Sequence, residues 1–201
     1  PTRRSSDLER PNAGEIFLHG KKLEIRHTKD AVNNGIAMVT EDRLRCGLIH
    51  EKCVSFNMSL AYLDKITRYG LVNAKREIED CGRMRDQMNL KMAGFSQQSG
   101  TLSGGNQQKV IIGKWLLTQP EVLILDEPTR GIDVGAKAEI YALIGELARQ
   151  GKAILLISSE LPELMGISDR IVVISRGKQT AVIERDEFDA ETIMKYAFGQ
   201  A

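Results

Sequence analysis

Two short stretches of this chain carry residue types that could act on a phosphate. In VLILDEP, residues 122–128, an apolar segment delivers two adjacent carboxylates, Asp126 and Glu127, at its end. Parallel α/β sheets bind ligands at the carboxyl ends of their strands. There Asp126 would hold Mg²⁺ through its water shell, and Glu127 would polarise the attacking water of a phosphoryl transfer. The plainer interpretation is a solvated strand-to-loop junction, which the apolar run and Pro128 disfavour.

The second stretch is LSGGNQQKV, residues 102–110. Glycines lack a Cβ and so let the backbone approach an anion. A helix that begins near Asn106 would direct unpaired N–H groups and the positive end of its dipole toward that anion. Ser103 would add a hydroxyl donor. Alone this is a weak signal, because loops that precede helices often have this composition.

These stretches need rigid elements to position them, and the hydrophobic pattern predicts such elements. Helical spacing indicates helices over Asn106–Thr118 and Val134–Gln150, the second ending at Gly151. The apolar runs Glu121–Leu125 and Ala153–Ile157 predict strands that are buried on both faces, as in a parallel sheet. Strands that alternate with helices indicate an α/β fold.

The flanking regions predict smaller elements. We expect two short strands around a turn at His19-Gly20, a helical turn over Asp30–Gly35, a strand over Ile36–Val39, helices around Val54–Leu63 and Lys75–Leu90, a hairpin around Arg176-Gly177-Lys178, and a last helix that Asp189 caps and that ends near Gly199.

Composition is typical of an ordinary soluble protein, with 42% hydrophobic and 27% charged residues. A net charge of +1 gives no reason to expect nucleic acid or an anionic membrane as a partner. The apolar runs are too short to span a bilayer and no secretory signal opens the chain, so we expect the cytoplasm. Cys46, His50 and Cys53 lack the spacing of a zinc site, and reduced thiols are the expected state.

Residues 1–8, PTRRSSDL, differ in character from the rest of the chain. The string matches one reading frame of a common DNA-sequencing adapter, so we predict that residues 1–8 are not native. A natural basic, disordered arm is the alternative. The segment is therefore excluded from the fold prediction.

Taken together, in this order and at this separation, the two stretches resemble the ATP-binding cassette (ABC) ATPases. LSGGNQQ is similar to the signature loop of that family, ILDEP to its Walker B strand, and GID around Asp133 to its D-loop. TEDR, DEPTRGIDVGAK and ISSELPE closely resemble the second cassette of tandem ATPases that drive ribose-, galactose- and xylose-type sugar importers. The resemblance implies a P-loop NTPase-like α/β fold over 9–201, divided into a small antiparallel β part and Q-loop equivalent (9–43), a helical subdomain (44–101), and a part with the signature, Walker B and D-loop (102–201).

One family motif does not occur in this chain. A P-loop needs G-x-x-x-x-G-K-[ST], and no such string is present in the 201 residues. The family places the loop upstream of the segment that matches residues 11–20. The resemblance therefore implies a cassette that is truncated at its N-terminal side and lacks the Walker A strand and loop. Such a fragment would expose unpaired backbone groups and apolar faces, so we expect it to be poorly soluble and inactive as an ATPase.

The resemblance also implies ATP and Mg²⁺ as cofactors and a role for each matched residue. Glu127 would be catalytic, and Asp126 and Glu41 would contact the metal. In the family, cassettes pack head to tail, and the signature of one grips the γ-phosphate held by the other. Glu41 replaces the usual glutamine and Ser159 the usual histidine, so we expect weak hydrolysis at this cassette's own site. The implied nucleotide contacts are Leu102, Ser103, Gly104, Gly105, Gln107, Asp133 and Ser159.

The implied function is that of the ATP-binding subunit of a sugar importer, peripheral at the cytoplasmic face of the plasma membrane. Its partners would be an upstream cassette of the same polypeptide, permease subunits that dock near 44–101 and, indirectly, a periplasmic sugar-binding protein. One alternative is a regulatory cassette that binds nucleotide without turnover, which Glu41 and Ser159 favour and Glu127 opposes. Another is a non-transport ABC ATPase that acts on ribosomes or DNA, which the near-neutral charge disfavours.

Overall fold

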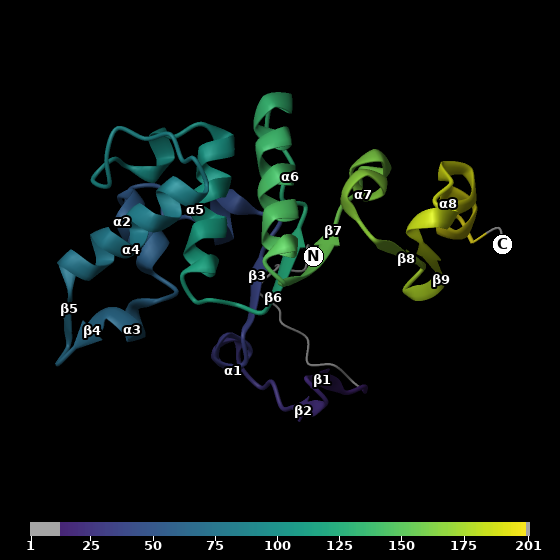
Figure 1. Cartoon of the computed structure of the whole chain (residues 1–201), viewed down its shortest axis with the longest axis horizontal. Coiled ribbons are helices and arrows are strands. Elements are labelled where there is room, and N and C mark those ends of the chain that lie inside the picture. The colour runs from purple at the N-terminus through teal and green to yellow at the C-terminus, as the bar shows by residue number, and fades with distance from the viewer. Residues whose placement is uncertain (1–12, 200–201) are drawn as a thin grey trace, which may run out of the picture.

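The computed structural model describes residues 13–199, so segment 1–8 lies outside the described residues. Its centre is a parallel sheet of three strands in the order β3 (Ile36–Val39), β6 (Val122–Asp126) and β7 (Ala153–Ile157) (Figure 1). Parallel strands need crossover connections, and long helical segments make them here. The α/β prediction is confirmed, with β3 and β7 at the predicted bounds.

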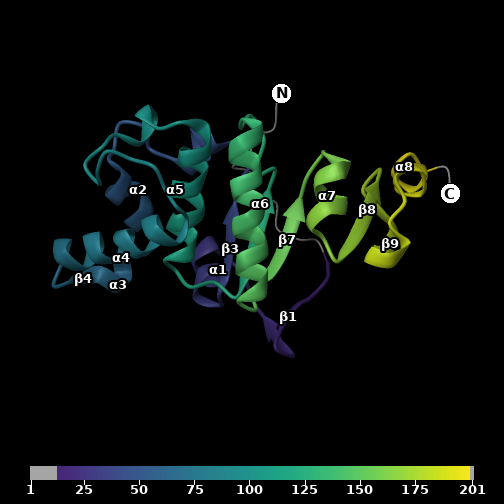
Figure 2. The same cartoon turned by 45° about the horizontal axis from the view of Figure 1, so that its top comes forward.

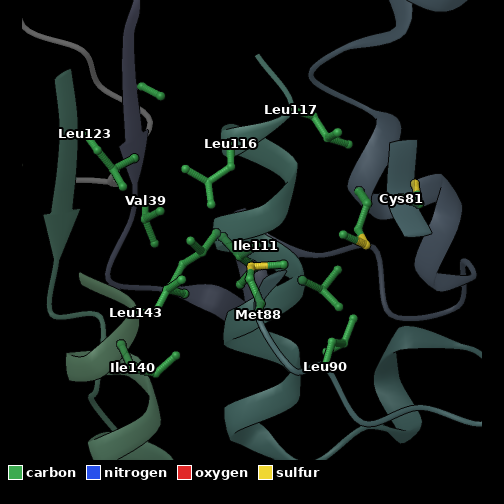
Figure 3. Close-up of a cluster of buried hydrophobic side chains, with 14 of the residues drawn as sticks. Val39, Cys81, Met88, Leu90, Ile111, Leu116, Leu117, Leu123, Ile140 and Leu143 are labelled. Carbon is green, nitrogen blue, oxygen red and sulfur yellow. The ribbon is translucent and has the colours of Figure 1, made fainter. Parts of the chain in front are cut away.

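Two helices cover one face of this sheet. Helix α5 (Gly104–Leu116) packs on β3, and α6 (Val134–Arg149) packs on both α5 and β7 (Figures 1 and 2). Figure 3 shows Val39 and Leu123 from the sheet beside Leu116 of α5, within one continuous hydrophobic core. Both predicted helices are confirmed, although α5 begins two residues before Asn106.

The opposite face of the sheet corrects one prediction. Strands β6 and β7 were expected to be buried on both faces, but only alternate residues are covered: Leu125 is fully buried, whereas Leu155 is 53% exposed. Met38, Ile124 and Leu155 pair across the sheet on the second face. Among residues 13–199, α5 and α6 pack only against the first face, so the apolar run of β7 keeps one side in solvent.

The segments before and after the sheet form small hairpins, as predicted. Strands β1 (Ile16–Leu18) and β2 (Lys21–Leu23) join through His19 and Gly20, both with positive φ, which is typical of a tight hairpin turn. Helix α1 (Thr28–Asn33) follows them and ends before Gly35, whose φ is +75°. The polypeptide then enters β3.

The C-terminal part has its own small core. Helix α7 (Leu161–Ile167), which the pattern did not predict, leads to the antiparallel pair β8 (Arg170–Ser175) and β9 (Lys178–Glu184) and then to a short 3₁₀ helix, η3 (Arg185–Glu187). In the last helix, α8 (Ala190–Ala197), the Asp189 carboxylate accepts the backbone N–H of Thr192, so the predicted cap is confirmed. The side chains buried between these elements are Ile171, Val173, Ile183 and Ile193.

Residues 44–101 are mainly helical, but the helices are more broken than predicted. The expected helix around 54–63 is split into α2 (Val54–Ser59) and α3 (Leu63–Ile66), and α4 (Ala74–Gln87) ends before Asn89, whose φ is 48°. The minor elements of this region are a π-helix η1 (Arg43–Gly47), a hairpin of β4 (Thr67–Arg68) and β5 (Leu71–Val72), and a 3₁₀ helix η2 (Ser99–Thr101). Helices α2 and α4 pack on α5. Across residues 13–199, every helix is too short or too polar to cross a bilayer.

Candidate functional site

The end of β6 is fastened to the loop after β7. The backbone N–H of Glu127 donates to the Ile157 carbonyl at 2.9 Å, and the Glu127 carboxylate accepts the backbone N–H of Ser159 at 2.7 Å. Glu127 has φ 47°, a conformation that non-glycine residues adopt at a cost and that clusters at functional sites. The fold thus brings together two residues that the sequence singled out, 32 positions apart.

Asp126 has the surroundings of a cation ligand. Its partial burial, and then the neighbouring Glu127 carboxylate, raise the pKa of Asp126. Within residues 13–199 no basic side chain forms an ion pair with Asp126, and no group of three histidine, cysteine or acidic side chains is placed so that it could hold a metal ion by itself. Mg²⁺ commonly binds proteins through one or two carboxylates and completes its shell with water and phosphate oxygens. Asp126 fits that donor set.

Glu41, the other predicted metal contact, already has a cationic partner. Its carboxylate forms an ion pair with the Arg130 guanidinium, from the turn that follows the Asp126–Glu127 pair. Both side chains are partly exposed to solvent. The predicted metal role of Glu41 stays a prediction, because a cation would have to compete with Arg130 for this carboxylate.

A buried carboxylate that the sequence reasoning missed supports this region. Glu163 of α7 is 6% exposed, and it accepts the Thr129 hydroxyl at 2.5 Å and the Ser158 hydroxyl. Thr129 follows Glu127, and Ser158 precedes Ser159. Glu163 therefore holds both backbone segments that create the Glu127–Ser159 contact. Its signals in the sequence are its place at the end of ISSELPE, which was noted only as a resemblance, and its acidic character between Leu161 and Leu164 of an otherwise apolar segment.

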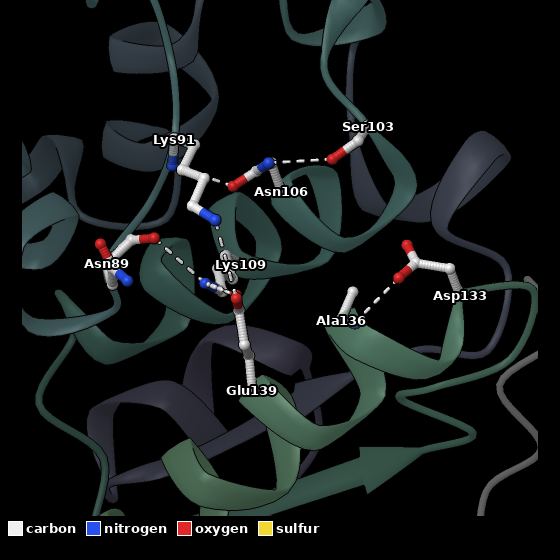
Figure 4. A network of polar contacts seen from close by, with 8 residues as sticks. All are labelled: Asn89, Lys91, Ser103, Asn106, Lys109, Asp133, Ala136 and Glu139. Carbon is white, nitrogen blue, oxygen red and sulfur yellow. Dashed lines mark hydrogen bonds and ion pairs between the residues drawn. The ribbon is translucent and has the colours of Figure 1, made fainter.

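The LSGG loop stands at the start of α5. The helix begins at Gly104, with Ser103 at the N-cap position, and the first N–H groups of a helix have no acceptor within it. The Ser103 hydroxyl accepts the Asn106 side-chain amide at 2.8 Å, while the other side of that amide accepts the backbone N–H of Lys91 at 2.9 Å (Figure 4). The loop is thus ordered and can offer N–H donors to an anion.

Both glycines of the loop lie close to a neighbouring side chain. A Cβ on Gly105 would lie 2.5 Å from the Cβ of Ala136 on α6. A Cβ on Gly104 would lie 3.0 Å from Nη2 of Arg43. Close packing of α5 against α6 therefore accounts for Gly105 beside any role in anion binding, whereas a larger residue at position 104 would press against Arg43.

Polar side chains beneath the loop fix α5 against α6. Gln107, predicted as a nucleotide contact, is buried and donates to the Leu102 carbonyl at 3.1 Å, so it holds the loop from inside. Lys109 donates to the Glu139 carboxylate at 2.6 Å and to the Asn89 carbonyl at 3.1 Å (Figure 4). Asp133 caps α6 by accepting the N–H of Ala136 at 2.9 Å. The residues at the start of α6 thus lie beside the LSGG loop, since a Cβ on Gly105 would meet both Ile132 and Ala136.

The sequence profile of the ABC transporter family matches residues 5–130, well over half of the chain. This chain belongs to the ABC transporter family. Members of the family bind ATP, typically with Mg²⁺. The matched range begins inside residues 1–8, and the predicted foreign origin of that segment stays a prediction.

The ABC chain is similar to two curated relatives over nearly its whole length. It is 50% identical to the xylose import ATP-binding protein XylG of Moorella thermoacetica over 94% of the chain and 37% of that protein. It is 48% identical to the ribose import ATP-binding protein RbsA of Geobacillus kaustophilus over 92% of the chain and 38% of that protein. The chain thus spans well under half the length of these relatives.

A solved structure supports the fold of this ABC chain. The ATP-binding cassette MJ0796, in a dimeric post-hydrolysis state bound to ADP and Pi, matches with a TM-score of 0.74 and covers 90% of this chain and 77% of that one. At 20% identity the likeness concerns the fold alone. It confirms the predicted ABC-type α/β architecture.

Proposed function

We propose that this chain is the ATP-binding part of a sugar importer and couples ATP hydrolysis to transport. The observation that carries the hydrolytic assignment is the carboxylate pair at the end of β6, where the Ser159 N–H orients Glu127 beside Asp126. The relatives support sugar import, and because their names differ in the sugar, the proposal stops at monosaccharides.

The carboxylates would divide the work as their surroundings dictate. Bound Mg²⁺ would neutralise charge on the phosphates. Asp126 would hold that ion, which relieves the repulsion that its carboxylate experiences from Glu127. Glu127 would orient and polarise the attacking water, and its hydrogen bond to Ser159 fixes the direction of its carboxylate.

The signature loop would act on a nucleotide held by a second cassette. Ser103 is exposed, and the first N–H groups of α5 have no acceptor within the helix, so these donors are available to a γ-phosphate across an interface. We propose that this second cassette is an upstream part of the same longer polypeptide. That arrangement would give the LSGG loop a role independent of the chain's own carboxylates.

The chain's own nucleotide site would be the weaker of the two. Ser159 contributes a backbone N–H to Glu127, and its hydroxyl cannot carry the positive charge of an imidazole. Glu41 is neutralised by Arg130. We infer impaired rather than abolished hydrolysis, because Glu127 is present and oriented.

The remaining partners follow from the same proposal. The exposed apolar face of β7 is suited to be covered by further segments of a longer polypeptide, since such a face is costly in water. Permease subunits would dock on the helical region 44–101, and a periplasmic sugar-binding protein would act through them. The protein would lie peripherally at the cytoplasmic face of the membrane.

The test uses the complete polypeptide with its permease and binding protein in liposomes. Sugar-stimulated ATP turnover supports the proposal, and its absence with ribose, xylose and galactose contradicts it. We expect Gly104→Ala to lower turnover about 100-fold, because the added methyl group meets Arg43 and would displace the preorganised N–H donors at the start of α5. Gly94→Ala is the matched control, because a Cβ there meets no atom within 4 Å. Glu127→Gln should have a smaller effect than Gly104→Ala, and the reverse order would exchange the two sites.

The second candidate is a cassette that binds nucleotide without hydrolysis. The Glu41–Arg130 ion pair and the serine at position 159 favour it. Tight ATP binding by the complete protein, with no turnover in the presence of permease and sugar, would decide for this candidate.

A further inference from the structure

Arg43 lies where three functional segments meet. It begins the π-helix η1, directly after the segment that holds Glu41. Its guanidinium donates to the Gly131 carbonyl at 3.2 Å and, more weakly, to the Arg130 carbonyl at 3.5 Å. These carbonyls belong to the turn between the Asp126–Glu127 pair and Asp133. One side chain thus joins the end of β3 to the turn after β6.

The same guanidinium touches the signature loop. A Cβ built on Gly104 would lie 3.0 Å from Arg43 Nη2, so the guanidinium lies directly beside this glycine. Below it, η1 packs closely on α5, since a Cβ on Gly47 would lie 2.6 Å from Cδ1 of Ile111. Arg43 therefore contacts the LSGG loop on one side and the turn at 130–131 on the other.

A second contact joins two of these segments. Glu41 forms an ion pair with Arg130, so both charged ends of Glu41–Arg43 are directed at residues 130–131. An exposed ion pair alone contributes little. A guanidinium that donates to two successive carbonyls adds charge-assisted hydrogen bonds with fixed geometry. The two contacts together set the position of the turn relative to η1.

We infer that Arg43 is a positioning residue that fixes the signature loop to the turn before Asp133, and that Glu41 acts through Arg130 in the same link. The inference rests on the proposed function, in which the signature loop serves one nucleotide and the Asp126–Glu127 pair serves another. Arg43 then couples the two nucleotide sites mechanically. Glu41 serves this link rather than the metal.

The test compares Arg43→Met and Arg43→Lys with Arg45→Met in the complete protein with its permease. Arg45 is two residues away, is 87% exposed and pairs only with Asp42 among residues 13–199, which makes it a matched control. A misplaced loop should lower kcat on the order of 10- to 100-fold for Arg43→Met and leave the KM for ATP within about twofold. The kcat of Arg43→Lys should lie between those of wild type and Arg43→Met, because lysine keeps the positive charge but lacks the two-pronged guanidinium that donates to both carbonyls. Equal kcat for Arg43→Met and Arg45→Met overturns the inference.

A second measurement does not depend on turnover. In the nucleotide-free protein, Arg43→Met should accelerate amide hydrogen exchange in residues 103–106 and 129–133 together, and Arg45→Met in neither. Acceleration in only one segment, or in none, overturns the link. If the wild-type protein shows no ATP turnover, the proposed function fails, while the exchange experiment still decides whether the link exists.

A charge swap tests the part assigned to Glu41. Glu41→Arg and Arg130→Glu should each lower kcat, and the double variant should recover at least half of the loss. Recovery supports a positioning role, because an arginine at position 41 cannot bind a cation. If the kcat of the double variant is no higher than those of the single variants, Glu41 does not act through Arg130.

If Arg43→Met fails to fold, Arg43→Lys still tests the role of Arg43.

Discussion

The two faces of the central sheet have similar residues and different surroundings. On the first, Val39 and Leu125 are fully buried beneath α5 and α6. On the second, Met38 of β3 is 39% exposed and Leu155 of β7 is 53% exposed, one register position away from Val39 and Leu125 in the same sheet. The apolar runs alone gave both faces the same prediction. The difference shows that an apolar run predicts a strand whose side chains favour burial. Which face of that strand is buried depends on the helices that pack against it.

The largest effect should separate Leu125 from Leu155. Leu125→Ala leaves a cavity in the core and should lower the free energy of unfolding by about 2–5 kcal/mol. Leu155→Ala in the 201-residue chain should cost no more than about 0.5 kcal/mol, as is usual for surface substitutions. Urea unfolding of the two variants measures both values. Similar losses would mean that the second face is also covered in solution.

Leu125→Ala and Leu155→Ala can also be compared in the longer protein. If other segments cover the second face there, Leu155→Ala should become a core substitution and cost about 2–5 kcal/mol. Unfolding measured in the complete polypeptide gives this value. A cost that stays near that of the 201-residue chain would contradict the proposed cover.

Two glycines test the covering helices. Gly105→Ala forces a methyl group against Ala136 of α6 and should destabilise the fold by about 1–3 kcal/mol, the usual cost of overpacking. Gly145 of α6 faces open space, and Gly145→Ala should stabilise the fold by about 0.5–1 kcal/mol, because alanine is the better helix former. Thermal unfolding of both variants should give shifts of opposite sign. Shifts of the same sign would show that the α5–α6 contact is looser than described.

The carboxylate end of β6 should show a smaller effect that depends on pH. Burial and Glu127 raise the pKa of Asp126 above its value in the unfolded chain, so ionised Asp126 opposes folding at neutral pH. The folded state takes up the proton first as the pH falls, so this penalty shrinks below the raised pKa and is gone only below the pKa of the unfolded chain. Asp126→Asn should therefore be more stable than wild type at pH 7, and the difference should shrink toward pH 4. An equal difference at both pH values would rule out this electrostatic cause.

Leu155→Lys should have the smallest effect on stability, but it should change solubility. Leu155→Lys puts a charge on the exposed face and should leave the urea midpoint nearly unchanged, because the side chain is already in contact with solvent. It should reduce self-association, since charges on exposed strands oppose pairing between molecules. Light scattering at increasing protein concentration measures this. Lys21→Leu, on the separate β1–β2 hairpin, is a control for a change of charge elsewhere.

Local patterns determined most of the elements. The runs at 36–39 and 153–157 correspond to β3 and β7, and the predicted cap at Asp189 forms. Strands and caps of this kind depend on residues within a few positions of one another, so they can be predicted from the sequence alone. The break between α2 and α3 was missed, because tertiary packing can override helical spacing.

By itself, the sequence therefore determined the carboxylate pair, the LSGG loop, the family that they resemble and the order of strands and helices. Only the tertiary structure decided that Glu127 meets Ser159, that Glu41 pairs with Arg130, that Glu163 is a buried acceptor and that one face of the sheet stays open. The contacts of Glu127 with Ser159, of Glu163 with Thr129 and of Glu41 with Arg130 join positions 32 to 89 apart in the chain, and the open face depends on which helices pack where. Contacts between distant segments follow from packing, and no local pattern records them.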